Sequence, residues 1–487
     1  MAVSSFFKRP GVWLTLCALI TVATLWQFHS RFPFDDTFIS FRYAEHLAKG
    51  HGLVWNIGGP PTEGYTNFLF ILLLSAARFV TNNLLFAAQL IGMVCTITTG
   101  LLLYESGRTL RSSPVGLLAA VLYYTAPLTW VNGLSGMETS LFVLLVVATL
   151  TSVAKNRIRP ALVFAFLATL TRPEGALLAA LILILQLTDR TSIPRAVKNW
   201  LIWFAIPCLI YAVWKYLYFG QLLPNSFYIK VLDKSHSVLP GLQYVRLFVT
   251  SVLALVAASL TSRHVREPAL LAAILWVVML ILFYLFVTPL EGLYDRFLWP
   301  AFTVLCLTAS VGVSDAVSRY RVGMAYPAIL LLAANCLLMR VSPRTNQVFA
   351  AHEDVWDVSM DKIVDEINRL PHRDSILLGY GDAGYVVYRT GIQHLDLFGL
   401  NDSRIAHAKS KEERAAIVRA ERPDILLLPV RLADTGQVLV EDAYGLARTS
   451  QFSLVGSFPA FPYTLGIYVN AESRYAADVR SHFSMAK

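Results

Sequence analysis

The sequence has 487 residues with a net charge of +9; 56% of the residues are hydrophobic and only 15% are charged, and the mean hydropathy is +0.55. These values exclude a soluble enzyme as the whole chain. The positive charge does not indicate nucleic-acid binding, because Lys and Arg gather in short loops between apolar runs, where they act as topology signals. We predict no nucleic-acid site.

Apolar runs recur as far as Arg340, after which the composition becomes ordinarily polar. A membrane-spanning helix needs about 20 mostly apolar residues. Eleven runs are predicted to span, some of them short: 12–28, 84–104, 115–130, 138–154, 160–171, 175–188, 198–219, 242–262, 268–288, 297–317 and 322–340. The sequence therefore predicts a polytopic α-helical membrane domain, residues 1–341, followed by a soluble domain, residues 342–487.

One further apolar run, 66–80, decides the orientation. If it spans, five loops rich in Lys and Arg face outward while Lys8 and Arg9 face inward, which breaks the positive-inside rule five times. If it lies along the interface, all of these loops join the N-terminus in the cytoplasm. We therefore predict that 66–80 does not span, that the N-terminus is inside, and that the C-terminal domain is outside.

This orientation gathers the unusual polar segments on the outer side. They are the first outer loop with its juxtamembrane helices, 29–83, and the shorter segments 133–138, 171–175, 223–234 and 291–296. Charged residues at helix ends beside the bilayer usually line a cavity or a pathway. We therefore expect the functional cavity at the outer surface.

Two adjacent carboxylates, Asp35 and Asp36, follow the first apolar run and precede a helical pattern. Such a pair can supply a general base for a hydroxyl group together with an orienting partner, or it can hold a divalent cation such as Mg²⁺, Mn²⁺ or Ca²⁺. The alternative interpretation is ordinary helix capping, because Asp is common before a helix.

Four cationic side chains in the outer segments are candidate phosphate ligands: Arg42, Arg172, Lys230 and Arg296. A guanidinium group binds phosphate through two parallel hydrogen bonds, and a lipid phosphate near the interface needs such charge stabilisation. The alternative for each is snorkelling to the lipid headgroups or pairing with a neighbouring carboxylate, Arg296 with Asp295 and Arg172 with Glu174.

Further side chains of the same segments are candidate substrate ligands: Tyr43, His51, Glu63, Tyr65, Glu138, Glu174 and Tyr294. Aromatic residues at helix ends usually form the interfacial belt, which is the alternative for the tyrosines. Glu138 opens a predicted helix and could equally complement the helix dipole.

The C-terminal domain alternates helical and strand-like patterns. The run 353–369 is helical, and the runs 375–380, 424–429, 452–459 and 463–469 are strand-like. The patterns predict a small α/β domain. His394 and Asp396 lie in its Gly-rich stretch, and their spacing favours a turn network over a metal site.

Several stretches together resemble a known family: DDTFISFRYAEHLAKGHGLVWNIGGPPTEGYTNFL, GMET, TRPEG, YDRFLWP and GDAGYVVYRTGIQHLDLFGLND. They are similar to polyprenyl-phosphate-dependent glycosyltransferases of the GT-C fold. Within that fold they look most like the arabinofuranosyltransferases that add terminal sugars to mycobacterial cell-wall arabinan, and like a related bacterial enzyme that arabinosylates pilin.

The resemblance implies a multi-pass protein of the bacterial inner membrane with its active site on the outer face. Asp35 and Asp36 would be catalytic, with Asp35 the preferred base. The donor would be a polyprenyl-phosphate sugar, D-arabinofuranose for this branch, and the acceptor a cell-wall polysaccharide or a protein such as pilin. One departure concerns the acceptor-side loop, where residues 59–62 read Gly-Pro-Pro-Thr and lack the expected acidic residue.

Two other functions remain open. A lipid-linked hexose transferase would keep the same fold. A non-enzymatic lipid or sugar transporter would favour internal repeats and broken helices at mid-membrane, and the sequence shows no such repeat.

Overall fold

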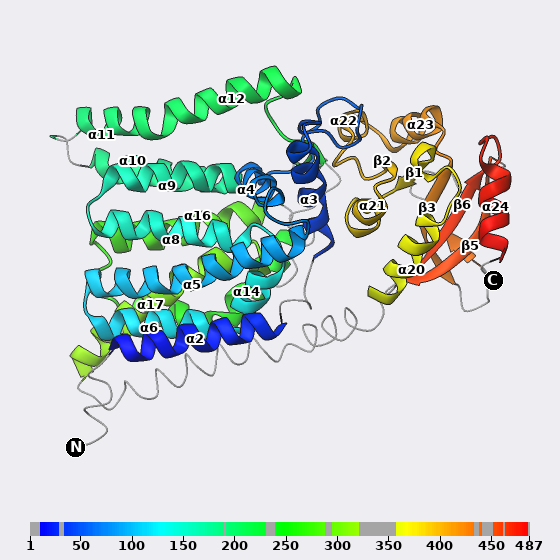
Figure 1. Cartoon of the computed structure of the whole chain (residues 1–487). Helices are drawn as coiled ribbons and strands as arrows, with labels where there is room; N and C mark the ends of the chain where they lie inside the picture. Colours follow the sequence, from blue (N-terminus) through cyan, green and yellow to red (C-terminus); the bar gives the residue numbers. More distant parts are fainter. Residues whose placement is uncertain are drawn as a thin grey trace.

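The computed structural model describes residues 10–28, 34–188, 191, 193–229, 239–287, 295–320, 357–432, 438–440, 451–460 and 463–485. The described residues form a body of helices that lie side by side and an α/β domain at one end of that body (Figure 1). The predicted span 322–340 lies outside the described residues, as do the candidate ligands Lys230 and Tyr294.

The helical body contains several long apolar helices. In the part of the chain that the structure describes, five helices could cross a membrane, or seven if each sharply bent pair counts as one span. The five are α2 (Pro10–Phe28), α5 (Leu84–Leu110), α16 (Pro268–Phe286), α17 (Trp299–Tyr320) and the continuous α11 (Ile193–Trp200), η2 (Leu201–Ala205) and α12 (Ile206–Phe219). The chain is therefore a multi-pass membrane protein.

Two predicted spans are broken rather than straight. The run 115–130 forms α6 (Ser113–Thr125) and α7 (Pro127–Leu134), bent by 64°, and the run 242–262 forms α14 (Leu239–Ser251) and α15 (Leu253–Leu260), bent by 69°. The first break follows from Pro127, which disfavours helical geometry at the preceding residue; Ala126 is accordingly extended, with ψ 120°.

Three shorter apolar helices agree with predicted runs: α8 (Thr139–Ala154), α9 (Ile158–Thr171) and α10 (Ala176–Leu187), the last preceded by the 3-10 turn η1 (Pro173–Gly175). Small residues let the helices of the body approach closely. A Cβ atom at Gly92 of α5 would lie 2.1 Å from the carbonyl oxygen of Gly133 in α7. A Cβ atom at Gly116 of α6 would lie 2.1 Å from the carbonyl oxygen of Tyr104 in α5.

The run 66–80 forms α4 (Phe68–Arg78), which packs beside α3 (Asp35–Ala48). With 11 residues, α4 is shorter than a membrane crossing requires, since a helix of this length rises only about 16 Å against a hydrocarbon core of about 30 Å. This agrees with the predicted non-spanning position.

The basic loops meet at the end of the body opposite the α/β domain. Arg111, after α5, pairs with Glu267, before α16, at 3.0 Å. Lys155, after α8, pairs with Glu105 of α5 at 2.6 Å. These ion pairs bring three of the five basic loops together on one side, and the cytoplasmic location of all five stays a prediction.

The α/β domain contains a six-stranded sheet with the order β2-β1-β3-β6-β5, to which β4 adds beside β3. Strands β1 (Leu377–Tyr380), β2 (Gln393–Asp396) and β3 (Ile425–Leu432) are parallel, and β4 (Val438–Val440), β5 (Phe452–Ala460) and β6 (Tyr463–Asn470) extend the sheet in antiparallel pairs. Its helices are α20 (Asp357–Asn368), α21 (Tyr385–Thr390), α22 (Ser403–His407), α23 (Lys411–Glu421) and α24 (Ala476–Met485).

Candidate active site

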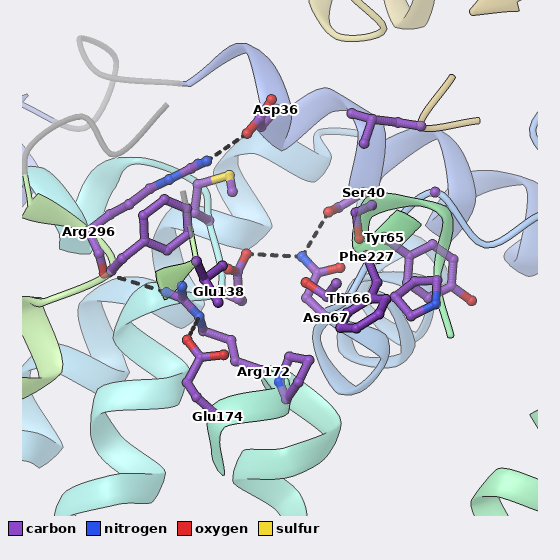
Figure 2. Close-up of a pocket in the computed structure, with 18 of the residues that line it drawn as sticks. Asp36, Ser40, Tyr65, Thr66, Asn67, Glu138, Arg172, Glu174, Phe227 and Arg296 are labelled. Atoms are coloured by element: carbon purple, nitrogen blue, oxygen red, sulfur yellow. Dashed lines mark hydrogen bonds and ion pairs between the residues drawn. The ribbon is translucent and has the colours of Figure 1, made fainter. Parts of the chain in front are cut away.

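A cavity of about 450 Å³ lies where α3 meets the helical body and the α/β domain. Its polar lining comes from segments far apart in the chain (Figure 2). The lining includes Asp36, Ser40, Tyr65, Asn67, Glu138, Arg172, Glu174, Tyr284 and Arg296. The outer segments that the sequence singled out therefore converge on one cavity.

Helix α3 presents Asp36 and Ser40 to the cavity on one face. The two residues are four positions apart, which places their side chains one turn from each other. The N-cap position of α3 is Phe34, whose side chain makes no capping bond. Neither acidic residue is therefore the N-cap, although both lie in the first turn, where a negative charge complements the helix dipole.

Asp36 forms an ion pair with Arg296, with 2.8 Å between Oδ2 and Nη2 (Figure 2). Arg296 precedes α17, and its guanidinium also lies 4.7 Å from the ring centroid of Phe297. The guanidinium side chain is 5% exposed and the carboxylate 23% exposed. The alternative pairing of Arg296 with Asp295 is wrong, because the described partner of the guanidinium is Asp36.

A second buried charge pair adjoins the first. Arg172 Nε lies 2.8 Å from Glu174 Oε1, and the hydroxyl of Tyr284 donates to the same oxygen at 2.6 Å. Arg172 also donates to the Tyr284 hydroxyl at 3.0 Å, and more weakly to the carbonyl of Arg296 at 3.4 Å. Each arginine therefore faces a carboxylate, which offsets the cost of burying its charge.

A third polar group of the cavity is an amide flanked by a hydroxyl and a carboxylate. Asn67 Nδ2 donates to Ser40 Oγ and to Glu138 Oε2, each at 3.0 Å. All three side chains are buried. Glu138 precedes α8, so this group joins the first outer loop to the helical body.

The structure does not bring Asp35 into the lining of the cavity. Its Oδ1 accepts a hydrogen bond of 2.7 Å from the backbone N–H of Tyr385, at the start of α21. The contact is so close that a Cβ atom at Gly384 would lie 2.0 Å from Asp35 Oδ2. The two adjacent carboxylates therefore face different parts of the protein.

Arg42 also lies away from the cavity lining. Its guanidinium is buried and donates to four acceptors: the carbonyls of Trp55, Val387 and Ile392, and the side chain of Asn56. Two of these carbonyls belong to the α/β domain. Arg42 therefore connects α3 to the α/β domain. Contrary to the prediction from the sequence, it is not placed to bind a phosphate in the cavity.

Three further candidates lie outside the lining. Tyr43 donates its hydroxyl to Asn401 Oδ1 at 3.0 Å, and Glu63 forms a buried ion pair with Lys215 of α12 at 2.8 Å. His51 is exposed, with its ring 6.1 Å from that of His46. Tyr43 thus bonds the first outer segment to the α/β domain, and Glu63 bonds it to α12. His51 does not line the cavity.

His394 and Asp396 form the predicted turn network. Asp396 accepts four hydrogen bonds, from the backbone N–H groups of residues 398, 399 and 401 and from the Asn401 amide. His394 Nδ1 accepts from Trp55 Nε1, and its Nε2 lies 3.1 Å from the carbonyl oxygen of Tyr380. Burial lowers the pKa of His394 to about 3, so the ring is neutral and Nε2 is the donor.

Within the described segments, no group of three or more His, Cys, Asp or Glu side chains is placed to hold a metal ion. Asp35 and Asp36, the expected cation ligands, contact Tyr385 and Arg296 respectively. A cation held by both carboxylates therefore stays a prediction.

Sequence reasoning did not single out four residues of this region: Ser40, Asn67, Lys215 and Tyr284. Lys215 carried a usable signal, because a lysine inside an apolar run is costly unless it has a partner. Asn67 occupies a helix N-cap position, for which Asn is common. Ser40 and Tyr284 lie within otherwise ordinary helical patterns and gave no signal.

A known protein family matches the C-terminal part of the chain. The family described as a domain of unknown function, DUF8728, matches residues 354–477. No curated protein sequence matches the chain significantly.

Two solved structures are similar over nearly the whole chain. ArnT from Cupriavidus metallidurans, bound to undecaprenyl phosphate, superposes with a TM-score of 0.62 at 12% identity, covering 93% of this chain and 98% of that one. The oligosaccharyltransferase AglB from Archaeoglobus fulgidus, in complex with an inhibitory peptide and a dolichol-phosphate, gives 0.59 at 10% identity, covering 93% and 80%. The likeness shows the fold: this chain has the GT-C fold, with a small C-terminal sheet domain.

Proposed function

We propose that the protein is a polyprenyl-phosphate-dependent glycosyltransferase that acts on an extracytoplasmic acceptor. The observation that carries the proposal is the Asp36–Arg296 pair in a cavity that also holds Arg172. A carboxylate that shares a cavity with two guanidinium groups suits a reaction that removes a proton from a hydroxyl and expels a phosphate. ArnT and AglB, which share the fold, were solved with a polyprenyl or dolichol phosphate.

In the proposed reaction Asp36 accepts the proton of the acceptor hydroxyl, and the oxygen of that hydroxyl attacks the anomeric carbon of the donor sugar. The bond between that carbon and the phosphate oxygen breaks, and its electron pair leaves with the polyprenyl phosphate. Arg296 and Arg172 stabilise the charge that develops on the leaving phosphate, since guanidinium N–H donors suit phosphate oxygens. No other reactant is required.

Asp35 receives a different role in this scheme. It was the base that the resemblance favoured, but Asp36 is the carboxylate that lines the cavity. Asp35 accepts the Tyr385 N–H and thereby holds the start of α3 against the α/β domain. We therefore assign the base to Asp36 and positioning to Asp35.

The finer identity of the substrates rests on the sequence motifs alone. They favour D-arabinofuranose as the sugar, a cell-wall polysaccharide or a protein such as pilin as the acceptor, and the outer face of the bacterial inner membrane as the location. A lipid-linked hexose is the alternative donor, because a cavity of about 450 Å³ admits either sugar with a phosphate.

The test uses purified full-length protein in lipid nanodiscs, supplied with radiolabelled polyprenyl-phosphoryl arabinofuranose or polyprenyl-phosphoryl mannose and an arabinan oligosaccharide or pilin. Labelled acceptor together with released polyprenyl phosphate is the expected result, and Asp36→Asn is the inactive control. Parallel reactions with EDTA test the cation. Movement of intact donor across the bilayer with no cleavage would instead indicate a transporter.

A further inference from the structure

Asn67 occupies the N-cap position of α4, but its side chain does not cap the helix. An Asn at this position normally accepts a backbone N–H bond through its side chain, and Asn83 does so at the start of α5, accepting from Phe86 N at 3.0 Å. The Asn67 side chain makes no such bond. It turns instead into the cavity, toward Ser40 and Glu138 (Figure 2).

The contacts of Asn67 determine which atom of its amide, the nitrogen or the oxygen, remains without a hydrogen-bond partner. Both N–H groups of Nδ2 are used, one by Ser40 Oγ and one by Glu138 Oε2. The reversed orientation would place the amide oxygen against the carboxylate of Glu138, where two acceptors repel. Oδ1 is therefore held as an acceptor, and it is buried with no hydrogen-bond partner among the described residues.

A buried acceptor without a partner destabilises the folded protein, so it is rarely retained without a use. Asn67 is only 5% exposed and lines the cavity. A ligand that donates a hydrogen bond at this position would satisfy the amide oxygen.

Glu138 adds a second acceptor next to the first. It is 7% exposed and lines the cavity, and the two arginines of the cavity form their ion pairs with Glu174 and Asp36 instead. Two neighbouring acceptors, one of them a carboxylate, suit a ligand with two neighbouring hydroxyl groups. They disfavour a ligand that carries negative charge at the same place.

The distance along α3 between Ser40 and the assigned base, Asp36, is comparable to the size of a sugar ring. Ser40, which holds Asn67, lies one helical turn beyond Asp36 on α3, a rise of about 6 Å. A monosaccharide whose anomeric carbon lies near Asp36 and Arg296 would thus extend its hydroxyl groups toward Asn67 and Glu138.

We propose that Asn67 and Glu138, oriented by Ser40, form the subsite for the donor sugar, and that this subsite selects an uncharged sugar with neighbouring hydroxyl groups. The inference rests on the proposed function, since it specifies which part of the donor the same cavity recognises. It also separates the cavity into a phosphate half, with the arginines, and a sugar half, with acceptors.

The test measures binding of two ligands to full-length protein in nanodiscs: a polyprenyl-phosphoryl pentose and the sugar-free polyprenyl phosphate. Asn67→Leu removes the amide oxygen, and Glu138→Gln keeps the partner of Asn67 but removes the charge. We expect the sugar-bearing lipid to bind about 3- to 10-fold more weakly to Asn67→Leu and about 10- to 100-fold more weakly to Glu138→Gln. Affinity for the sugar-free lipid should not change.

Asn83→Leu is the matched control, because it removes an Asn from the start of the next helix, where the side chain does cap. It should lower thermal stability and leave both affinities unchanged. Equal weakening of both lipids by Asn67→Leu, or no weakening of either, would overturn the subsite. Wild-type protein that binds neither lipid would instead refute the proposed function.

A donor that carries a uronic acid tests the selection for uncharged sugars. It should bind wild-type protein more weakly than the neutral donor, and Glu138→Gln should narrow this difference because the like charge is removed. Equal binding of the two donors to the wild type would refute the selection while leaving the glycosyltransferase proposal intact.

Discussion

The carboxylate of Asp35 accepts a hydrogen bond from the backbone N–H of Tyr385, 350 residues later in the chain, at 2.7 Å. Its neighbour Asp36 turns the other way and pairs with Arg296. Two adjacent residues of the same type thus have separable tasks, one at an interface and one in a cavity.

Asparagine substitutions should distinguish these tasks. Asp36→Asn keeps the size of the side chain but cannot accept a proton, so transfer should fall about 10²–10⁴-fold. Asp35→Asn retains an oxygen that can accept the Tyr385 N–H, so its transfer rate should stay within a few-fold of wild type. Initial rates with labelled donor check both. The assignment of the base is wrong if Asp35→Asn is the inactive variant and Asp36→Asn the active one.

Arg296→Lys should reduce transfer although it keeps the positive charge. Lysine lacks the planar fork that can serve a carboxylate and a phosphate at once. We expect kcat/KM to fall about 10-fold or more, which corresponds to roughly 1.4 kcal/mol of transition-state stabilisation. Unchanged turnover in both Arg296→Lys and Arg296→Ala would remove this residue from the site.

Arg42→Met should lower stability and leave donor recognition intact. The substitution leaves the buried carbonyls of Trp55, Val387 and Ile392 without their donor. Each unsatisfied buried group costs about 1–3 kcal/mol. A thermal-shift assay should show a clearly lower Tm, while the KM for donor of the protein that remains folded should match wild type. A raised KM with unchanged Tm would restore Arg42 as a phosphate ligand.

The buried pair of Glu63 and Lys215 predicts a non-additive double substitution. Removing one partner leaves a buried charge uncompensated, at a cost of about 3–5 kcal/mol. Lys215→Met and Glu63→Gln should therefore each lower Tm, and the double variant should recover much of the loss. Additive losses in this double-mutant cycle would show that the two side chains do not depend on each other.

His394 predicts an acid-sensitive interface. Its folded pKa of about 3 lies below the unfolded value of about 6.5. Between these values the unfolded chain binds more protons, so stability falls as pH decreases below about 6.5, by up to about 1.4 kcal/mol per pH unit. No cost arises above pH 6.5.

A variant is needed to isolate this effect. Burial raises the pKa of Asp396 to about 6 and that of Glu63 to about 7. Carboxyl groups with raised pKa values bind more protons in the folded protein, so they increase stability as the pH falls, over part of the same pH range in which His394 decreases it. The Tm difference between wild type and His394→Gln should therefore change between pH 7 and pH 4, with wild type losing more. A constant difference would contradict the neutral buried histidine.

Much of the helical body could be predicted from hydropathy alone. The described counterparts of the predicted spans start and end within a few residues of the expected positions, because a long apolar run has few alternatives in a bilayer. The breaks at Ala126 and Val252 were missed, since composition does not show where a run bends, although Pro127 was a visible cause. In the sheet domain, β2 and β4 were missed, because strands of four and three residues are too short to show a strand pattern.

The candidate site could be predicted by segment but not by side chain. Residues 36, 138, 172–174 and 296 of the outer segments converge on the cavity as expected from topology. Which of Asp35 and Asp36 enters the cavity depends on the direction of α3 and on a partner in α21, and neither is encoded locally. The positions of Arg42 and Tyr43 outside the cavity could not be predicted for the same reason, because the Asn401 side chain that accepts from Tyr43 and two of the four acceptors of Arg42 lie more than 340 residues away.

The bonds between α3 and the α/β domain also set an order for biogenesis. Asp35 and Arg42 are synthesised early, but Tyr385, Val387 and Ile392 follow after the described membrane helices. Closing contacts of such sequence separation is slow, because the entropy of the intervening chain must be lost first. The cavity is therefore completed only when the last quarter of the chain has been made. A chain truncated before α20 would insert its helices yet carry an unfinished cavity, and Arg42 would lack two of its four acceptors, the carbonyls of Val387 and Ile392.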